Sequence, residues 1–256
     1  AHEYSTRSLE STWLLQLLFQ PNFVRLLLKF CPMVDASMTV CQGLADQYRR
    51  EFGLEPEVVY DAPPFHELTT KPTSPEKIRL VHHGIPVRER RIELMIEMMR
   101  YLDKRFSLDF YLMDTDSRYL QELKALAADN PAIEFKQPMA MREIPAVLNE
   151  NYDMGVFLLP PENFNYHYAL PNKFFEFIQA RLAVAIGPSP EMARIVRKEN
   201  LGIVADSFEA RDLAQRIGTL RIEDIDAFKA RSNKASEFYS YRSSEEKMLD
   251  VISSVF

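Results

Sequence analysis

The sequence predicts an α/β protein with a Rossmann-like parallel sheet and helices on both of its faces. Between residues 78 and 220, short apolar segments alternate regularly with longer segments of helical periodicity. Strands that alternate with helices of this length need crossover connections, which produce a parallel sheet covered on both faces. The composition agrees, because 46% of the 256 residues are hydrophobic and only 7 are glycine, as in globular proteins with a sizeable core.

The longest apolar run, residues 13–31, precedes this alternation. It is interrupted by two glutamines, a proline and two basic residues, namely Gln16, Gln20, Pro21, Arg25 and Lys29. A membrane-spanning helix does not carry polar groups at that density. The pattern predicts two amphipathic helices that meet at Pro21 and pack in a core, with binding to a membrane surface as the alternative.

A β-α-β unit follows the apolar run. Residues 34–41 and 57–64 have the composition of strands, and residues 42–53 between them have helical periodicity. Residues 65–77 are polar, contain two prolines and show no periodicity, which is typical of a linker. We therefore predict a domain boundary within this polar stretch.

Six strands and six helices are predicted after the linker. The strands are 78–83, 108–113, 133–137, 154–159, 183–187 and 202–206, and the helices are 90–104, 116–129, 141–149, 171–181, 189–198 and 209–220. The pattern of residues 222–256 predicts two further helices. In an open α/β sheet, ligands bind beyond the carboxyl ends of the strands, where helix N-termini favour anions. Residues directly after each strand are therefore the candidates for a binding site.

Charge, cysteines and motifs exclude several classes of protein. A net charge of -6 and an isoelectric point of about 5.5 argue against nucleic-acid binding. Cys31 and Cys41 lack the spacing of a zinc site or a disulfide framework, and they predict reduced thiols in the cytoplasm. His82 and His83 end the first strand after the linker, but a histidine pair without further ligands does not indicate a metal site. The motifs of kinases, dehydrogenases and serine hydrolases are absent from the sequence.

The segment "PNKFFEFIQARLAVAIGPSPEM" resembles a segment of the nucleotide-sugar-dependent glycosyltransferases with the GT-B fold, especially the retaining family-4 group. In that family the pattern is P-x-K, two hydrophobic residues and a glutamate, followed by a buried strand. Three other segments resemble the family in the same order: the acceptor domain's last strand-helix-strand unit (34–64), the donor domain's first strand, glycine loop and helix (80–102), and the strand and loop before the glutamate-bearing helix (153–168). The resemblance covers residues 34–220.

The resemblance implies how the chain is divided into domains. Residues 67–235 would form the Rossmann-like domain that binds the nucleotide-sugar donor, and residues 1–66 an incomplete second Rossmann-like domain on the acceptor side. The helix in residues 236–256 would pack back on that first domain. His2 and Glu3 resemble a His-Glu pair that follows a mid-domain strand in some relatives. We therefore expect this sequence to begin partway through the acceptor domain.

The resemblance also implies roles for residues that would bind the donor. Glu176 would accept hydrogen bonds from the ribose hydroxyls, and a position in the first turn of its helix would stabilise its charge. Lys173 and Arg90 would bind the diphosphate, with Arg88 as a further basic candidate, because their cations suit phosphate oxygens. Gly84 belongs to the glycine loop. The alternative explanations are a favourable helix start and a solvated basic face.

The sequence departs from the family pattern at two positions. Relatives often carry a second glutamate eight residues before the ribose-binding one, where this sequence has Tyr168, and Arg91 stands at a usual glycine position. Asn165 and Tyr168 would therefore offer neutral hydrogen bonds to the donor, with a plain surface loop as the alternative. Pro138 and Met139 would contact the nucleobase, with core packing as the alternative for the methionine.

We therefore expect a glycosyltransferase of the hexosyltransferase type. It would move a sugar, with retention, from a nucleotide-diphosphate-sugar to a glycan, lipid-linked or other acceptor in polysaccharide biosynthesis. We expect no metal and no cofactor, since the nucleotide-sugar is a substrate, and a cytoplasmic location, with peripheral membrane contact as an alternative. The competing hypothesis is a non-catalytic or degenerate GT-B domain that binds a partner, and activity of this fragment alone is left open. Nucleotide affinity distinguishes the two hypotheses.

Overall fold

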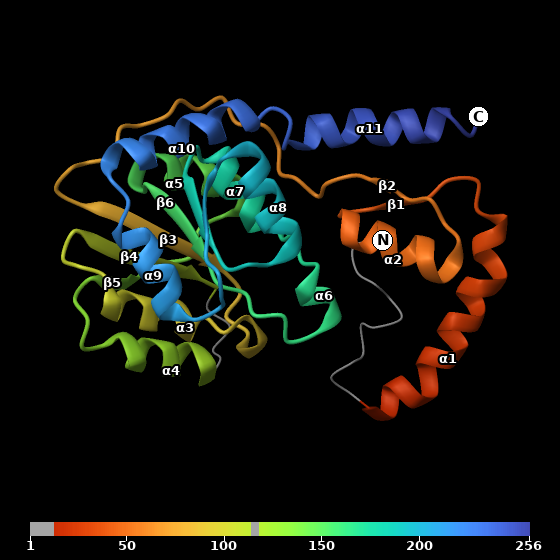
Figure 1. The fold of residues 1–256 in the computed structure, drawn as a ribbon, viewed down its shortest axis with the longest axis horizontal. Coiled ribbons are helices and arrows are strands. Elements are labelled where there is room, and N and C mark those ends of the chain that lie inside the picture. Colours follow the sequence, from red (N-terminus) through yellow and green to blue (C-terminus); the bar gives the residue numbers. More distant parts are fainter. Residues whose placement is uncertain (1–12, 114–117) are drawn as a thin grey trace.

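The computed structural model describes residues 13–113 and 118–256, and this part contains a six-stranded parallel sheet (Figure 1). Its strands are β3 (Ile78–Gly84), β4 (Phe106–Leu112), β5 (Ile133–Phe135), β6 (Met154–Phe157), β7 (Ala183–Ile186) and β8 (Gly202–Val204). Their spatial order is β5-β4-β3-β6-β7-β8, and every neighbouring pair is parallel. The strand order reverses between β3 and β6. A reversal of this kind creates a crevice at the carboxyl ends of the two strands.

Helices cover both faces of this sheet (Figure 1). One face packs on α3 (Glu93–Met98), α4 (Arg118–Ala127) and α9 (Ala210–Gly218), and the other on α5 (Ile144–Asn151), α7 (Asn172–Gln179) and α8 (Pro190–Glu199), with α10 (Ile222–Ala235) beside α7 and α8. In β7, Ala183 and Ala185 pack in the core that contains α3, α4 and α9. Val184 and Ile186 pack in the core on the opposite face, which contains α5, α7 and α8. Strands buried on both faces are apolar throughout, which is why the sequence revealed them.

The sheet and its helices confirm the predicted fold class. The predicted strands are present, although β4 begins at Phe106, before the predicted start. The single helix predicted over 90–104 is wrong, because a 3₁₀ turn, η3 (Arg88–Arg90), ends at Arg91 in a left-handed conformation with φ 49°. The helix α3 therefore begins only at Glu93, and the 3₁₀ turn η4 (Met99–Tyr101) follows it. The predicted start of α4 falls among residues 114–117, outside the described residues.

A small two-stranded parallel sheet precedes the main one. It consists of β1 (Met38–Thr39), α2 (Gln42–Phe52) and β2 (Glu57–Val58), which is the β-α-β unit that the sequence predicts. Backbone bonds from Glu57 to Ser37 (2.9 Å) and from Val59 to Thr39 (2.8 Å) extend the pairing. The strands are shorter than predicted, because no other strand in the described part of the chain pairs with them.

The apolar run forms one helix, α1 (Trp13–Phe30), and the prediction of two helices is wrong. Pro21 lies inside α1, where flanking leucine, arginine and lysine residues of high helix propensity continue the helix despite the missing amide. From residue 20 on, where the structure describes the side chains, the predicted core packing is also wrong, because Phe23, Leu26 and Phe30 are 40%, 52% and 49% exposed. Within residues 13–113 and 118–256, no helix has the length and apolarity needed to cross a membrane. The His2-Glu3 pair lies outside the described residues.

The predicted linker, residues 65–77, is hydrogen-bonded to side chains of the main domain. Arg181 donates to the carbonyl of His66 (2.6 Å) and Asn149 to that of Thr69 (3.0 Å). The amide of Thr73 donates to Asp226 on α10 (2.9 Å). An extended segment without strand partners needs such side chains to satisfy its backbone, so the polar composition of the stretch serves its attachment.

The last helix, α11 (Tyr241–Ser253), leaves the main domain and runs beside the small sheet (Figure 1). Ser244 donates to the carbonyl of Tyr60 (2.7 Å), and Lys247 donates to that of Val58 (2.8 Å). The amide of Tyr241 donates to the carbonyl of Pro63 (2.8 Å). The C-terminal helix is therefore attached to β2 and to the segment that follows it.

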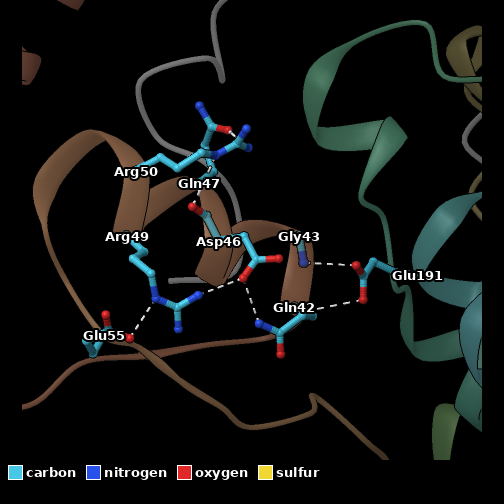
Figure 2. A network of polar contacts seen from close by, with 8 residues as sticks. All are labelled: Gln42, Gly43, Asp46, Gln47, Arg49, Arg50, Glu55 and Glu191. Atoms are coloured by element: carbon cyan, nitrogen blue, oxygen red, sulfur yellow. Dashed lines mark hydrogen bonds and ion pairs between the residues drawn. The ribbon is translucent and has the colours of Figure 1, made fainter.

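A buried carboxylate on α8 caps the helix of the small sheet (Figure 2). Glu191, in the first turn of α8, is 5% exposed and accepts from the amides of Gln42 (3.3 Å) and Gly43 (2.9 Å) at the start of α2. The first amides of a helix have no acceptor within it, and the dipoles of both helices favour a negative charge at this place. The ring of Tyr168 lies against Gly43, where an added Cβ would come within 2.0 Å of it. The main domain thus holds α2 by charge and by packing.

Replacing Glu191 by Ala should lower the free energy of unfolding by about 1–2 kcal/mol, because two amides of α2 lose their acceptor. Urea unfolding followed by circular dichroism measures this change. Glu223→Ala is the matched control, because Glu223 also lies in the first turn of a helix, α10, but is exposed. The control should change the free energy by less than about 0.5 kcal/mol. Equal losses in the two variants would contradict the capping role of Glu191.

Candidate functional site

A cavity of about 360 Å³ lies beyond the carboxyl ends of β3 and β4, where α7 begins. Its lining comes from five places in the sequence: His83, Gly84 and Ile85; Arg90; Tyr111 and Met113; Pro138, Met139, Met141 and Ile144; and Pro171, Asn172, Lys173 and Glu176. The structure therefore brings together most of the predicted site residues, namely Gly84, Arg90, Pro138, Met139, Lys173 and Glu176. The cavity lies at the end of β3, beside the reversal of the strand order, where an open α/β sheet binds ligands.

Glu176 lies in the second turn of α7, and the prediction that it lies in the first turn is wrong. The helix begins at Asn172, directly after Pro171. The Glu176 side chain is buried, and burial raises the pKa of its carboxyl to about 7, although the nearby Lys173 ammonium lowers it. Desolvation therefore has a larger effect on this carboxyl than any favourable charge near it. The carboxyl changes its charge close to neutral pH.

Lys173 is buried in the first turn of α7, where its ammonium contacts two aromatic rings. Its Nζ lies 4.5 Å from the centre of the Phe157 ring and 3.2 Å from Nε2 of His82. Nδ1 of His82 lies 2.9 Å from the carbonyl of Val156, so we assign the proton to Nδ1, and Nε2 accepts from Lys173. Burial, together with the charge of Arg90, lowers the pKa of Lys173 well below its usual value. A negatively charged ligand would stabilise this ammonium.

Gly84 allows Lys173 and Arg90 to approach each other at the end of β3. Its φ of 128° is rare for residues with a side chain, and an added Cβ would lie 2.9 Å from Nζ of Lys173 and 3.6 Å from Nη1 of Arg90. Glycine is therefore required both by the backbone and by the closeness of the two cations. Nη1 of Arg90 also donates to the carbonyl of Ile85 (3.3 Å). Two cations around one glycine can bind the oxygens of a phosphate or diphosphate.

His83 lies between Glu176 and Phe177. Its Nε2 is 3.5 Å from Oε2 of Glu176, and its ring packs edge-on against Phe177 with the centroids 5.4 Å apart. Burial, with the charge of Lys173, lowers the pKa of His83 to about 3, so the imidazole is neutral. Its Nε2 is buried and makes no hydrogen bond to the residues that the structure describes. Within the same residues, no group of three or more His, Cys, Asp or Glu is placed to hold a metal ion.

The rest of the cavity wall is mostly apolar. Pro138 and Met139 contribute to it together with Ile85, Met113, Met141 and Ile144, and with the ring of Tyr111. The hydroxyl of Tyr111 accepts from that of Tyr152 (3.0 Å), which fixes the ring. Apolar and aromatic groups of this kind suit a flat heterocycle. Sequence reasoning missed Tyr111 and Met141, whose only signal is their closeness to the ends of β4 and β5.

Arg88, a predicted site residue, does not line this cavity. Its guanidinium pairs with Glu122 (2.6 Å) and lies 5.0 Å from the centre of the Tyr119 ring, both on α4. Successive residues of a 3₁₀ turn point about 120° apart, so Arg88 and Arg90 leave η3 in different directions. The sequence could not distinguish them, because the turn replaces the helix that the sequence predicts.

Asn165 and Tyr168 line a neighbouring cavity of about 200 Å³, not the first one. Val40, Leu44 and Asp61 of the N-terminal part also line it, and it shares Pro171 and Asn172 with the first cavity. Both predicted residues therefore lie next to the start of α7. The contact between Tyr168 and Gly43 could not be predicted, because the two residues are far apart in the sequence.

No protein-family model matches this sequence, and a search of curated proteins finds no match. Solved structures do match. TarM of S. aureus, a mutant in complex with fondaparinux, α-GlcNAc-glycerol and UDP, has a TM-score of 0.70 and 13% identity, over 88% of this chain and 45% of TarM. WaaG, a glycosyltransferase involved in lipopolysaccharide biosynthesis, has a TM-score of 0.59 and 12% identity, over 81% and 61%. HepE of Anabaena, with UDP and glucose, has a TM-score of 0.66 and 14% identity, over 90% and 66%.

These similarities establish the fold. The chain has the fold of the GT-B glycosyltransferases, as its resemblance to that family predicted. It spans between 45% and 66% of the length of these three proteins. Identities of 12–14% carry no statement about substrate.

Glu176→Gln should stabilise the protein at pH 8 and do so much less at pH 5. The carboxyl has a pKa of about 7 in the folded protein, against about 4.3 in an unfolded chain. The unfolded chain therefore loses the proton first, and the stability that neutral Glu176 contributes disappears as the pH rises to 7.

Thermal and urea unfolding at the two pH values measure this effect, and we expect the gain to be about 2 kcal/mol larger at pH 8 than at pH 5. Glu97→Gln on α3 is the control, because Glu97 is exposed and should show no such dependence on pH. A gain that is equal at pH 5 and pH 8 would contradict the raised pKa of Glu176.

Proposed function

We propose that this chain supplies the nucleotide-sugar donor site of a glycosyltransferase. The observation that carries the proposal is the convergence of Lys173, Arg90, Gly84 and Glu176 on one cavity beside the point where the strand order reverses. The fold that the chain shares with TarM and HepE, whose structures contain UDP, supports it. The donor would be held through its diphosphate, its ribose and its base.

Lys173 and Arg90 would bind the diphosphate. When the bond between the sugar and the diphosphate breaks, negative charge increases on the leaving phosphate oxygen. Two cations that are already in place stabilise this charge without reorganisation. Burial and the charge of Arg90 both disfavour the charged form of Lys173. The negative charge of a bound diphosphate would offset both effects and stabilise the ammonium. We therefore assign these two residues both donor binding and stabilisation of the leaving group, with no need for a metal ion or cofactor.

Glu176 would bind the ribose, and the apolar wall would bind the base. An ionised carboxylate accepts hydrogen bonds from two vicinal hydroxyls, and Glu176 lines the same cavity as the two cations and the apolar residues. Pro138, Met139 and Tyr111 would contact the faces of the heterocycle, since methionine and aromatic groups adapt to flat apolar surfaces.

The transferred sugar would lie toward Asn165 and Tyr168. Their cavity adjoins the nucleotide cavity at Pro171 and Asn172, and Asp61 from the segment after β2 also lines it. Amide, phenol and carboxylate groups all bind sugar hydroxyls. We thus propose that Asn165 and Tyr168 serve where family-4 relatives use a second glutamate.

The finer proposal follows the resemblance of residues 171–192 to the retaining family-4 group. It comprises a hexosyl donor, transfer with retention, and a glycan or lipid-linked acceptor in polysaccharide biosynthesis. The glycan ligands in the TarM structure support an acceptor of this class. The domain on the acceptor side would bind most of the acceptor and would supply the catalytic groups that act on it.

A non-catalytic GT-B domain that binds a partner is less well supported. Arg91, the residue that stands in place of a glycine, adopts the left-handed conformation of a glycine (φ 49°) and pairs with Glu93 and Glu162. It does not line the cavity. Burial disfavours the charged forms of Lys173 and Glu176. A domain without a ligand would gain nothing from burying these two side chains, whereas a donor site uses both.

Calorimetric titration of the chain with UDP, GDP, dTDP and ADP should show saturable binding of at least one of them. Glu176→Ala should weaken that binding about tenfold or more, because hydrogen bonds to a charged group contribute about 1.5–3 kcal/mol. A folded protein that binds none of the four nucleotides would contradict the donor site.

Two arginines two residues apart provide a matched test of the diphosphate site. Arg90→Ala should weaken nucleotide binding about tenfold or more, because its guanidinium lines the cavity. Arg88→Ala should change the Kd by less than about twofold, because Arg88 pairs with Glu122 on the surface. The same calorimetric titration measures both, and an equal loss in the two variants would disprove the assignment.

A further inference from the structure

We propose that His83 is a positioning residue for Glu176: its Nε2 donates to one carboxylate oxygen and directs the other to a ribose hydroxyl of the bound nucleotide. The inference rests on the proposed function, because it takes the ribose to be the ligand of Glu176. It adds a residue from β3 to a contact that the family pattern assigns to the glutamate alone. It also makes recognition of the ribose dependent on pH.

The packing around His83 fixes its ring beside Glu176. The side chains of His83 and Glu176 are 5% and 7% exposed, and Nε2 is 3.5 Å from Oε2. The edge-on contact with Phe177 holds the ring, and Phe177 is itself held against Gly155, where an added Cβ would come within 2.3 Å of it. A small rotation of the carboxyl brings the two atoms into hydrogen-bond range. Such a bond would satisfy Nε2, which has no partner in the described part of the chain.

The pair has two protonation states, which differ by one proton. Neutral Glu176 donates from Oε2 to Nε2, while Nδ1 of His83 carries the imidazole proton. Ionised Glu176 accepts from Nε2, which then carries the imidazole proton. The imidazole is neutral in both states, and only the ionised state presents a full carboxylate to the ribose. Binding of the ribose therefore selects the ionised state: the carboxyl proton moves from Oε2 to Nε2, and the Nδ1 proton of His83 is released to solvent.

Other charged and titratable groups line the two cavities that Glu176 also lines. They are Lys173 on α7, Arg90 on η3, Tyr111 on β4, Arg142 on η5 (Met141–Glu143), and His66 in the segment before β3. Lys173 favours the ionised carboxyl and burial opposes it, with a resulting pKa of about 7. The ionised fraction of Glu176 therefore rises about tenfold between pH 6 and pH 8, and the affinity for the ribose should rise with it.

The test is calorimetric titration with UDP, GDP and ADP and with their 2′-deoxy counterparts at pH 6, 7 and 8. The two members of each pair carry the same base and diphosphate, so the ratio of their Kd values isolates the hydroxyl. For the unaltered chain we expect the ribose form to bind at least about tenfold more tightly at pH 8. This preference should decrease toward pH 6.

Three variants separate positioning from folding. His83→Phe keeps a ring beside Phe177 and removes both nitrogens, so the preference at pH 8 should fall to about twofold. His83→Gln offers an amide donor and should keep most of the preference. His66→Phe is the control, because His66 lines an adjacent cavity of about 430 Å³ that shares Glu176, and it should behave like the unaltered chain. In each variant, an unchanged Kd for the 2′-deoxy nucleotide shows that the site is folded.

Each outcome has a separate meaning. If His83→Phe keeps both the ribose preference and its dependence on pH, the positioning role is wrong and the donor site stands. If the unaltered chain binds ribose and 2′-deoxyribose forms equally, the assignment of Glu176 to the ribose is wrong, and the role of His83 with it. If no nucleotide binds, the proposed function is wrong and the inference fails with it.

Discussion

The burial of two ionisable side chains, Lys173 and Glu176, among the phenylalanines of α7 is the constraint on which the candidate site depends. Every residue of α7 from Lys173 to Gln179 is buried, so the helix cannot rotate without disturbing the core. Close packing of that core fixes the two side chains relative to the end of β3. Burial disfavours the charged form of each, and each stabilises the charge of the other. The same packing thus determines the geometry and the protonation of the site.

Two glycines allow α7 to lie where it does. Gly155 in β6 leaves space for Phe177, and an added Cβ there would come within 2.3 Å of the ring. Gly84 at the end of β3 leaves space for the ammonium of Lys173. A side chain at Gly155 would push α7 away from the sheet. A side chain at Gly84 would move the ammonium of Lys173 away from the backbone of β3. The short distance between helix and strand ends therefore depends on the absence of two side chains.

The sequence predicted the parts of the structure that follow from local patterns. Strands such as β7 are apolar throughout because both of their faces are buried, and the rule for strand ends located Gly84 and Met139 at the cavity. It could not distinguish Arg90 from Arg88, because their directions depend on a 3₁₀ turn that replaces the predicted helix. It gave no sign of the pairing between His83 and Glu176, since packing through Phe177 brings them together.

Two glutamates with the same exposure show which one is available to a ligand. Glu176 and Glu191 are both 5% exposed. Glu191 receives hydrogen bonds from the amides of Gln42 and Gly43 and from Arg194 (3.0 Å), so its negative charge is already satisfied by the protein. Glu176 accepts no such bond from the residues that the structure describes: Nε2 of His83 lies 3.5 Å from Oε2, and Lys173 acts on the carboxyl through its charge. A buried carboxyl that lacks donors gains most from a ligand that brings hydroxyl groups, which is why we propose the binding role for Glu176 and the structural role for Glu191.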